Sequence, residues 1–311
     1  MADEVLDEIK ALYATQDYAK IVEVWGRDLS NSADFKRAAY QHYTPGKGDV
    51  VVSTYPKSGT TWALQMAYQI GYLGEGDFEH LDRVIPWPDK LIPLETPEVD
   101  DRSHLADSPT GLHVIKSHLE AAYVPYREEA KYITVVRDPK DMLVSLVHFE
   151  NGFNQLLFDD IVPPQVWIDT FISDNFIYQP WPMFIDSWWS ISDRDNVLVL
   201  IYEEMQADPR GTIRQLATFL GIDLTEAQVD KVAAKSDFAY MKANNHKFDP
   251  PAWDSGFVPL IREGKTGSAK QLLTTAQQAQ VDAHCLGEFA RLGSSFPYAE
   301  KFTVVTDVDS D

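Results

Sequence analysis

The chain alternates between short, continuously apolar runs and longer segments in which apolar residues recur three and four positions apart. Runs rich in β-branched residues are typical of buried strands, and they occur at 50–52, 113–116, 131–136 and 196–201. The periodic segments between and after them predict helices at 63–70, 139–150 and 211–220. Because strands that alternate with helices form parallel sheets, the pattern predicts an α/β fold with a central, mostly parallel sheet flanked by helices.

The two ends of the chain predict helices and a tail. Residues 1–30 predict one or two amphipathic helices, and 274–292 predict a last helix. We expect one domain over 1–303 and an acidic, disordered tail over 304–311. Loops, some with short helices, are expected where Pro, Gly and Asp gather or periodicity is lost, at 43–49, 74–112 and 244–270.

The loop after the first predicted strand has the composition of a phosphate-binding site. Residues 54–62 read Thr-Tyr-Pro-Lys-Ser-Gly-Thr-Thr-Trp and lead directly into the first core helix. Backbone N–H groups at a helix N-terminus point at an anion, and the helix dipole favours negative charge there. Gly59 lets the backbone approach closely, Lys57 supplies a positive charge, and Thr60 and Thr61 supply hydroxyl donors. A turn capped by Ser and Thr for structural reasons alone is the competing interpretation.

The loop differs from the nucleotide-triphosphate loop, which needs Gly, four residues, and then Gly-Lys-Ser/Thr. Here Lys57 precedes Gly59. The only Gly-Lys-Thr in the chain is at 264–266, and Pro259 stands where the first Gly of that motif would fall. A kinase-like or ATPase function therefore lacks its usual motif.

Polar blocks also follow the next two predicted strands, at the strand ends where open α/β sheets bind ligands. Lys116-Ser117-His118 ends the second strand, and Arg137 ends the third, eight residues before Ser145. The planar fork of an arginine can hold a phosphate through two hydrogen bonds. A surface ion pair of Arg137 with Asp138 or Asp141 is the structural alternative.

The charge balance bears on the kind of ligand. The chain has 48 acidic and 27 basic residues, a formal net charge of −21. A field of that sign disfavours binding to nucleic acid or to anionic membranes. It also repels a phosphorylated cofactor, so a pocket for one must be locally basic.

Cysteine content and hydropathy suggest the compartment. Cys285 is the only cysteine, so no disulfide can form within the chain, and a reducing cytoplasm is permitted. The acidic first residues lack a long apolar run, and no window of 18 apolar residues occurs, so we expect neither a secretory signal nor a membrane span. The expected localisation is cytoplasmic.

Taken in order, these blocks resemble the cytosolic sulfotransferase family, over about 49 to 267. That family transfers a sulfuryl group from 3′-phosphoadenosine 5′-phosphosulfate (PAPS) to a hydroxyl or amine, and PAP is the desulfated product. Residues 54–62 resemble its 5′-phosphosulfate loop, and 135–145 its 3′-phosphate segment. The resemblance implies a P-loop-NTPase-like sulfotransferase fold and a reaction that needs no metal.

The resemblance also implies residue roles. His118 would be the general base, since an imidazole has a pKa near neutrality. Lys57 would stabilise charge on the leaving phosphate oxygen, Lys116 would assist at the sulfuryl oxygens, and Ser145 would hold Lys57 away until the acceptor binds. The implied cofactor-binding residues are Lys57, Ser58, Gly59, Thr60, Thr61, Trp62, Arg137, Ser145, Tyr202, Ser236, Phe238, Met241, Arg262, Glu263 and Gly264.

Aromatic side chains in this set suit a purine. Tyr202 would contact the adenosine, and Trp62 would stack on the adenine with Phe238 nearby. Packing in the core is the competing interpretation for Phe238 and Met241.

Two segments depart from the family. Residues 262–270 correspond to Arg-Lys-Gly-x-x-Gly-Asp-Trp-Lys, but Glu263 replaces the Lys. A carboxylate there repels phosphate, so we hypothesise weakened cofactor affinity; Glu263→Lys should tighten PAP binding, and unchanged affinity would refute this. The family's dimer signature keeps Lys270 and Thr274 but has Thr275 and Ala279 in place of Val and Glu. The resemblance therefore allows a homodimer, but one in which the family's dimer contact has lost two of its residue types.

The expected acceptor is a small apolar or aromatic molecule bound among variable loops at 74–110, 150–180 and 244–260. Aromatic residues that suggest this, or that belong to the core, are Phe153, Phe158, Trp167, Phe171, Phe176 and Tyr178. Three other outcomes stay open: a non-catalytic PAP-binding protein, a nucleotide-dependent kinase-like enzyme, and sulfation followed by elimination.

Overall fold

The structure is a computed structural model that describes residues 2–26, 32–90, 94–173, 175–249, 260–262 and 264–306. It divides into two compact units, which we describe separately. The first comprises Met1–Ala38, Asp138–Ser190 and Lys265–Asp311; the second comprises Ala39–Arg137 and Ile191–Gly264.

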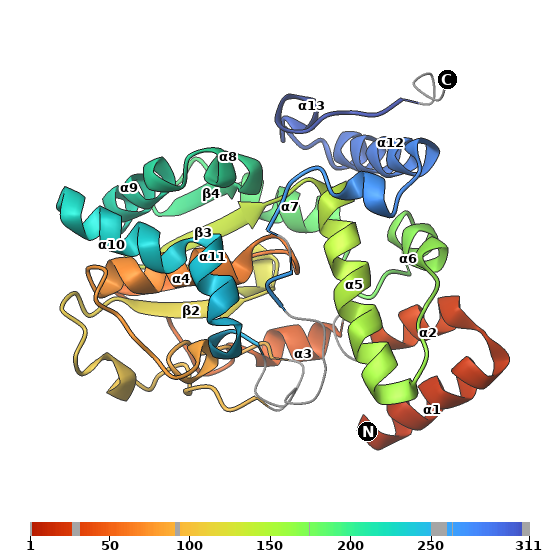
Figure 1. Ribbon diagram of the computed structural model, residues 1–311, viewed down its shortest axis with the longest axis horizontal. Coiled ribbons are helices and arrows are strands. Elements are labelled where there is room, and N and C mark those ends of the chain that lie inside the picture. The colour runs from red at the N-terminus through yellow and green to blue at the C-terminus, as the bar shows by residue number, and fades with distance from the viewer. Residues whose placement is uncertain are drawn as a thin grey trace. The chain divides into compact units, whose positions relative to one another are not determined.

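The second unit is built on a four-stranded sheet (Figure 1). Its strands are β1 (Asp49–Ser53), β2 (His113–Ser117), β3 (Lys131–Val136) and β4 (Val197–Ile201), in the order β2-β1-β3-β4. Every pairing is parallel, with Val51 opposite Ile115 on one side and Tyr132 on the other. The predicted parallel sheet with flanking helices is confirmed.

The strand sequences explain this arrangement. All five residues of β1 are buried, as expected for a central parallel strand covered on both faces. Val50 and Val52 point to one face, where they join the core formed with α4 (Thr60–Gly71), α9 (Pro209–Leu220) and α10 (Glu226–Ser236). Every residue of α4 except Thr61 and Trp62 is buried, so the helix behind the predicted phosphate loop is fixed in the core.

Shorter elements complete the second unit. They are α8 (Tyr202–Ala207), α11 (Phe238–Ala243), and the 3-10 turns η2 (Leu81–Arg83), η3 (Ser103–Leu105), η4 (Ala121–Tyr123) and η5 (Asn245–Lys247). Helix α9 begins at the Asp208 cap and ends before Gly221, which has a φ of 71°. Helix α10 begins with a capping box between Thr225 and Gln228.

The first unit is helical in its described part. Its elements are α1 (Ala2–Thr15), α2 (Tyr18–Trp25), α3 (Ala33–Ala38), α5 (Pro139–Phe158), α6 (Pro164–Phe171), α7 (Trp181–Trp189), η7 (Ala269–Gln271), α12 (Thr275–Leu292) and α13 (Tyr298–Lys301). Buried Lys140 near the start of α5 donates to Asp282 of α12 at 2.5 Å, and Tyr298 donates to the same carboxylate. Asp282 therefore joins α12 and the neighbouring α13 to α5, which is distant from both in sequence.

The helix predicted over 139–150 is confirmed but is longer than expected, and the loop expected over 150–180 is wrong where helices α5 and α6 occupy it. The helix that begins at Pro139 continues to Phe158, and α6 occupies much of the segment expected to be loop. Trp167, Phe171 and Phe176 are buried, so they belong to the core of the first unit rather than to an exposed acceptor loop. Helix α6 begins with Pro164 in its first turn, where the fixed φ of proline suits a helix start.

The C-terminal segment is held at least as far as Val305, whose N–H donates to Asp282 at 2.8 Å. Residues 307–311 lie outside the described residues, so the disordered tail and the single domain over 1–303 stay predictions. Within the described ranges, none of the helices is both long and apolar enough to cross a bilayer.

Candidate active site

Four predicted site segments meet at one edge of the sheet in the second unit. Thr54 follows β1, His118 follows β2, Arg137 follows β3, and Tyr202 follows β4. Because the strands are parallel, their carboxyl ends lie at the same edge of the sheet. Residues up to 148 positions apart in the sequence are thus placed at that edge. The Thr54 N–H donates to the Ser117 carbonyl at 3.2 Å, which ties the first two ends to each other.

The loop between β1 and α4 has the backbone that its sequence predicts. Gly59 caps α4 with a φ of 98°, and as a glycine it supplies no side-chain cap to the first turn of the helix. A Cβ on Gly59 would lie 2.7 Å from the ring of Tyr202, so both conformation and space require glycine. Lys57 also has a positive φ, 65°, an uncommon conformation for a side-chain-bearing residue that is often found at functional sites.

Polar groups in this loop fit an anion such as a phosphate. The N–H groups of the first turn of α4 are not capped by a side chain, and a helix N-terminus favours negative charge. Ser58 is fully buried, and its hydroxyl has no hydrogen-bond partner within the described part of the chain. Thr54 and Thr60 share a hydrogen bond between their hydroxyls at 2.5 Å. A buried hydroxyl without a partner is rare, and a phosphate oxygen would satisfy Ser58.

Arg137 supports this loop from the end of β3. Its guanidinium donates to the Lys57 carbonyl at 2.9 Å and lies 4.6 Å from the ring centroid of Tyr202. Only 7% of the residue is exposed. One face of the arginine thus stacks on an aromatic ring while its fork fixes the loop that carries Lys57.

The ring of His118 is held in one tautomer. Its Nδ1 lies 2.8 Å from the Thr54 carbonyl oxygen. Because a carbonyl can only accept, Nδ1 carries the proton in the neutral ring, and Nε2 keeps its lone pair. Burial lowers the pKa of His118 to about 3, and the positive charges of Lys116 and Lys57 act in the same direction. The imidazole is therefore neutral at physiological pH, as a general base must be.

Lys116 lies beside this base. Its ammonium is 3.3 Å from the ring centroid of Trp87, a cation–π contact, and the Trp87 ring meets that of His118 edge-on at 5.4 Å. Burial lowers the pKa of Lys116, while Asp82 and Asp89 act to raise it. The lysine, the histidine and the indole thus form one compact group.

The predicted adenine-side residues also gather in the second unit. The indole N–H of Trp62 donates to the Ser236 carbonyl at 2.8 Å, and the Trp62 ring meets Tyr202 edge-on at 5.7 Å. Phe238 is 38% exposed, whereas Met241 is 4% exposed and packs in the core. Core packing, the competing interpretation for both residues, therefore agrees with the surroundings of Met241 but not with the exposure of Phe238.

Comparison with known proteins identifies the family of this chain. The family model described as a sulfotransferase domain matches residues 47–293. Sulfotransferase 1C2 of Oryctolagus cuniculus is 30% identical over 275 residues, covering 85% of this chain and 86% of that protein. Sulfotransferase 1B1 of Mus musculus is 30% identical over 286 residues, covering 84% and 92%. The chain belongs to the sulfotransferase family. This match favours sulfuryl transfer over the kinase-like alternative.

Solved structures agree on the fold. A retinol dehydratase in complex with androsterone and inactive cofactor PAP has a TM-score of 0.66 at 20% identity, covering 85% of this chain and 87% of that chain. Mouse sulfotransferase SULT7A1 complexed with PAP has a TM-score of 0.61 at 22% identity, covering 83% and 90%. At these identities the likeness shows that this sulfotransferase has the α/β fold of those structures.

The remaining predicted residues lie outside the strand ends and the loop that follows β1. Ser145 lies on α5 in the first unit, whereas the other described site residues belong to the second. Glu263 lies outside the described residues. Gly264, with a φ of 58°, packs under the Phe238 ring, where a Cβ would lie 2.3 Å from a ring carbon. Arg262 contributes its carbonyl to Lys242 at 3.3 Å.

Sequence reasoning missed two side chains beside the candidate base, Trp87 and Asp89. Both lie in a segment assigned only as loop, and the backbone N–H of His118 donates to Asp89 at 2.7 Å. The pattern Pro86-Trp87-Pro88-Asp89 was a usable signal, because a rigid turn presents its aromatic and acidic residues in a fixed direction.

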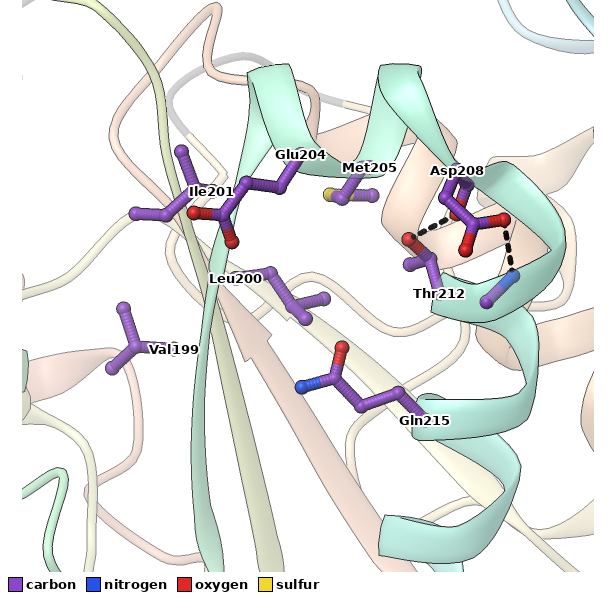
Figure 2. A pocket seen from close by; sticks show the side chains of 9 residues that line it. Val199, Leu200, Ile201, Glu204, Met205, Asp208, Thr212 and Gln215 are labelled. Atoms are coloured by element: carbon purple, nitrogen blue, oxygen red, sulfur yellow. Dashed lines mark hydrogen bonds between the residues drawn. The ribbon is translucent and has the colours of Figure 1, made fainter. Parts of the chain in front are cut away.

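A pocket of about 180 Å³ lies beside β4, but it contains no predicted site residue (Figure 2). Its lining is Val199, Leu200, Ile201, Glu204, Met205, Asp208, Gly211, Thr212 and Gln215. Asp208 there accepts from the Gly211 N–H, and its carbonyl accepts from the Thr212 hydroxyl, so these groups serve the start of α9. The described residues contain no cluster of three or more His, Cys, Asp or Glu that could hold a metal.

Proposed function

We propose that this sulfotransferase transfers a sulfuryl group from PAPS to the hydroxyl, or amine, of a small apolar or aromatic acceptor, with His118 as general base. The observation that carries the proposal is the hydrogen bond from His118 Nδ1 to the Thr54 carbonyl. It leaves Nε2 as the proton acceptor, at the sheet edge where a phosphate-type loop also begins. PAP in the solved structures of similar fold is consistent with this donor.

The loop would bind the phosphosulfate end of the donor. Backbone N–H groups at the start of α4 and the buried Ser58 hydroxyl offer hydrogen bonds, and Lys57 offers a charge. Arg137 keeps the loop in shape through the Lys57 carbonyl and adds a second cation. When bound, PAPS would supply the activated sulfuryl group. This group of cations overcomes the repulsion expected from a net charge of −21.

The chemical step would follow from the state of His118. Its Nε2 takes the proton of the acceptor hydroxyl as the oxygen attacks sulfur in line, and the Nδ1–H bond to Thr54 stabilises the imidazolium that forms. Lys57 stabilises the negative charge that develops on the leaving phosphate oxygen. Lys116 assists at the sulfuryl oxygens. As in phosphoryl transfer, positioning and charge stabilisation supply most of the catalysis.

The acceptor class is inferred from the surroundings of the base. Trp87 places an apolar ring 5.4 Å from the His118 ring, which suits an apolar or aromatic acceptor. The retinol dehydratase structures contain androsterone in one case and retinol in another, and for this chain we propose a small-molecule acceptor of that general kind. Cytoplasmic localisation, absence of nucleic-acid and membrane partners, and a homodimer with a weakened contact stay predictions, as does the role of Ser145.

Calorimetric titration with PAP, beside ATP plus Mg²⁺, tests the donor. Micromolar or tighter PAP binding without ATP binding is expected, and transfer from labelled PAPS to a panel of phenols and alcohols should follow. Mass spectrometry of the product separates a sulfate ester from an elimination product. PAP binding without turnover on any acceptor would favour the non-catalytic alternative, and failure to bind PAP would refute the proposal.

A further inference from the structure

We propose that Asp89 is a positioning residue for the candidate base, holding the backbone of His118 at the end of β2. The inference deepens the proposed function and depends on it for its catalytic consequence. Asp89 is 3% exposed, and its Oδ2 accepts from the His118 N–H at 2.7 Å. Its Oδ1 has no hydrogen-bond partner among the residues that the structure describes.

The carboxylate reaches His118 because the segment from Pro86 to Asp89 runs beside the end of β2. The Pro86 carbonyl accepts from the Lys116 N–H at 2.8 Å, which docks the segment on the strand. Trp87 then meets the ammonium of Lys116, and Asp89 meets the backbone of His118. This short segment therefore contacts both candidate catalytic residues, Lys116 within β2 and His118 just after the strand.

His118 is consequently fixed at two points. Asp89 holds its backbone N–H, and the Thr54 carbonyl holds its ring Nδ1. The direction of Nε2 follows from both, since the backbone sets where the ring is attached and the ring bond sets its rotation. Loss of the first contact lets the residue after the strand shift, and a shift of about 1 Å at a reacting group can cost about 100-fold in rate.

The groups that stabilise the Asp89 anion belong to the end of β2. A buried carboxylate is costly unless it is paired, and the His118 N–H, the Ser117 side chain and the charge of Lys116 act to stabilise this one, while its Oδ1 has no partner among the described residues. The titratable groups around it are Lys116 and the phenol of Tyr40. Burial raises the pKa of Asp89 to about 6, while the His118 N–H and the charge of Lys116 act to lower it. Above about pH 6 the carboxylate is ionised, and it then opposes the charge of Lys116 and accepts from the His118 N–H as an anion.

Three substitutions with one control test the proposal. Asp89→Ala removes the acceptor and should lower kcat by about 30- to 100-fold while PAP affinity stays within about three-fold. Asp89→Asn keeps an acceptor oxygen and should lose only about 3- to 10-fold. Asp89→Glu should recover more than Ala does. Asp82→Asn removes the other carboxylate that acts on Lys116, leaves His118 untouched, and should change kcat by less than about three-fold.

Two readouts separate positioning from structural support. The wild-type rate should fall as the pH drops below about 6, where Asp89 becomes neutral, and Asp89→Asn should lose that step. Imidazole nitrogen NMR of the protein without cofactor should show His118 protonated at Nδ1, and Asp89→Ala should give a mixture of tautomers.

Several results would overturn the inference. They are an unchanged kcat in Asp89→Ala, an Asp82→Asn loss as large as that of Asp89→Ala, or an unaltered His118 tautomer in the Ala variant. A loss in Asp89→Ala that is matched by equal losses of PAP binding and melting temperature would also count against it. If the wild-type protein transfers no sulfuryl group, the proposed function fails, and the NMR comparison still decides the role of Asp89.

Discussion

Two buried carboxylates at opposite ends of the same sheet differ in how fully they are bonded. Asp49, at the start of β1, accepts from Tyr43 at 2.5 Å, from the Gly46 N–H at 2.7 Å, and from Arg102 at 2.8 Å, and its contact with His113 is 3.1 Å. Asp89, at the carboxyl end, accepts from the His118 N–H at 2.7 Å, and the Ser117 side chain also stabilises it, but its Oδ1 has no partner among the described residues. Both are 3% exposed.

The difference separates structural support from function. The bonds to Asp49 join the turn before β1, the start of β2 and the loop that carries Arg102, so its four partners complete the fold. Both ends also contain buried polar atoms without a partner among the described residues: His113 Nε2 at the amino end, and the Ser58 hydroxyl and one oxygen of Asp89 at the carboxyl end. Ser58 differs from His113 because it lies in a loop that leads into a helix N-terminus, so an anionic ligand is its natural partner.

Substitution of His118 should give the largest effect and test whether the carboxyl end is catalytic. His118→Ala removes the proton acceptor and should lower turnover by about 10²- to 10⁴-fold, while PAP affinity changes only a few-fold. Steady-state kinetics and calorimetry measure the two quantities. Turnover retained near the wild-type level would show that His118 is not the base. The carboxyl end of the sheet would then have no demonstrated catalytic role to contrast with the amino end.

Asp49→Ala, at the amino end of the sheet, should lower the stability of the protein and leave its turnover unchanged. Removing the carboxylate leaves buried His113 without its acceptor, while Arg102 is 43% exposed and can be solvated, so we expect the free energy of unfolding to fall by about 1–3 kcal/mol. Urea denaturation measures this, and Asp49→Asn should cost less because it keeps an acceptor. At a temperature where the variant is folded, kcat should match that of the wild type. A large loss of kcat with little loss of stability would show that the amino end also serves the site.

The same contrast explains what the sequence could predict. Strands and the loop at 54–62 were predicted, because their signals are local: β-branched runs, a glycine in a left-handed turn, and a helix that follows. Parallel pairing then placed His118, Arg137 and Tyr202 at one edge without further information.

Contacts between distant segments escaped prediction. Asp89 acts on the backbone N–H of His118, and a main-chain donor carries no sequence signal. Lys140 was read only as part of a phosphate-binding segment, yet its side chain is buried against Asp282, 142 positions away. Burial of Trp167 also depends on α6, which lies within the segment 150–180 that was expected to be a loop.

Arg137→Lys should have an intermediate effect, which is measured as PAP affinity. It compares an arginine at the carboxyl end of the sheet with one at the amino end. Lysine cannot keep both the bond to the Lys57 carbonyl and the stack on Tyr202, so PAP affinity should fall by about ten-fold. The matched control is Arg102→Lys at the amino end, which should leave PAP affinity unchanged although Arg102 also contacts an aromatic ring, that of Tyr43. Equal losses in both variants would indicate a general effect of arginine on folding.

The smallest expected effect is a pair of opposite changes in acid stability. The pKa of His118 is lowered from 6.5 to about 3, so its neutral form stabilises the fold above pH 6.5 and this contribution is lost as the pH falls. The pKa of Asp89 is raised from 3.8 to about 6, so burying its charge costs stability at pH 7 and that cost disappears on acidification. Each contribution should be on the order of 1 kcal/mol between pH 7 and pH 5.

Urea denaturation at pH 7 and pH 5 tests the two signs. His118→Gln should lose less stability on acidification than the wild type, Asp89→Asn should lose more, and the double variant should return close to the wild-type difference. Equal behaviour of the two single variants would mean that the groups do not titrate separately, and that the carboxyl end is a coupled pair rather than a base with an independent anchor. Opposite signs would instead show that the edge of the sheet holds a neutral imidazole beside an anion. Burial favours the neutral imidazole, whereas the anion of Asp89 is held against burial by the His118 N–H and the charge of Lys116, and this is the electrostatic arrangement that the proposed proton transfer requires.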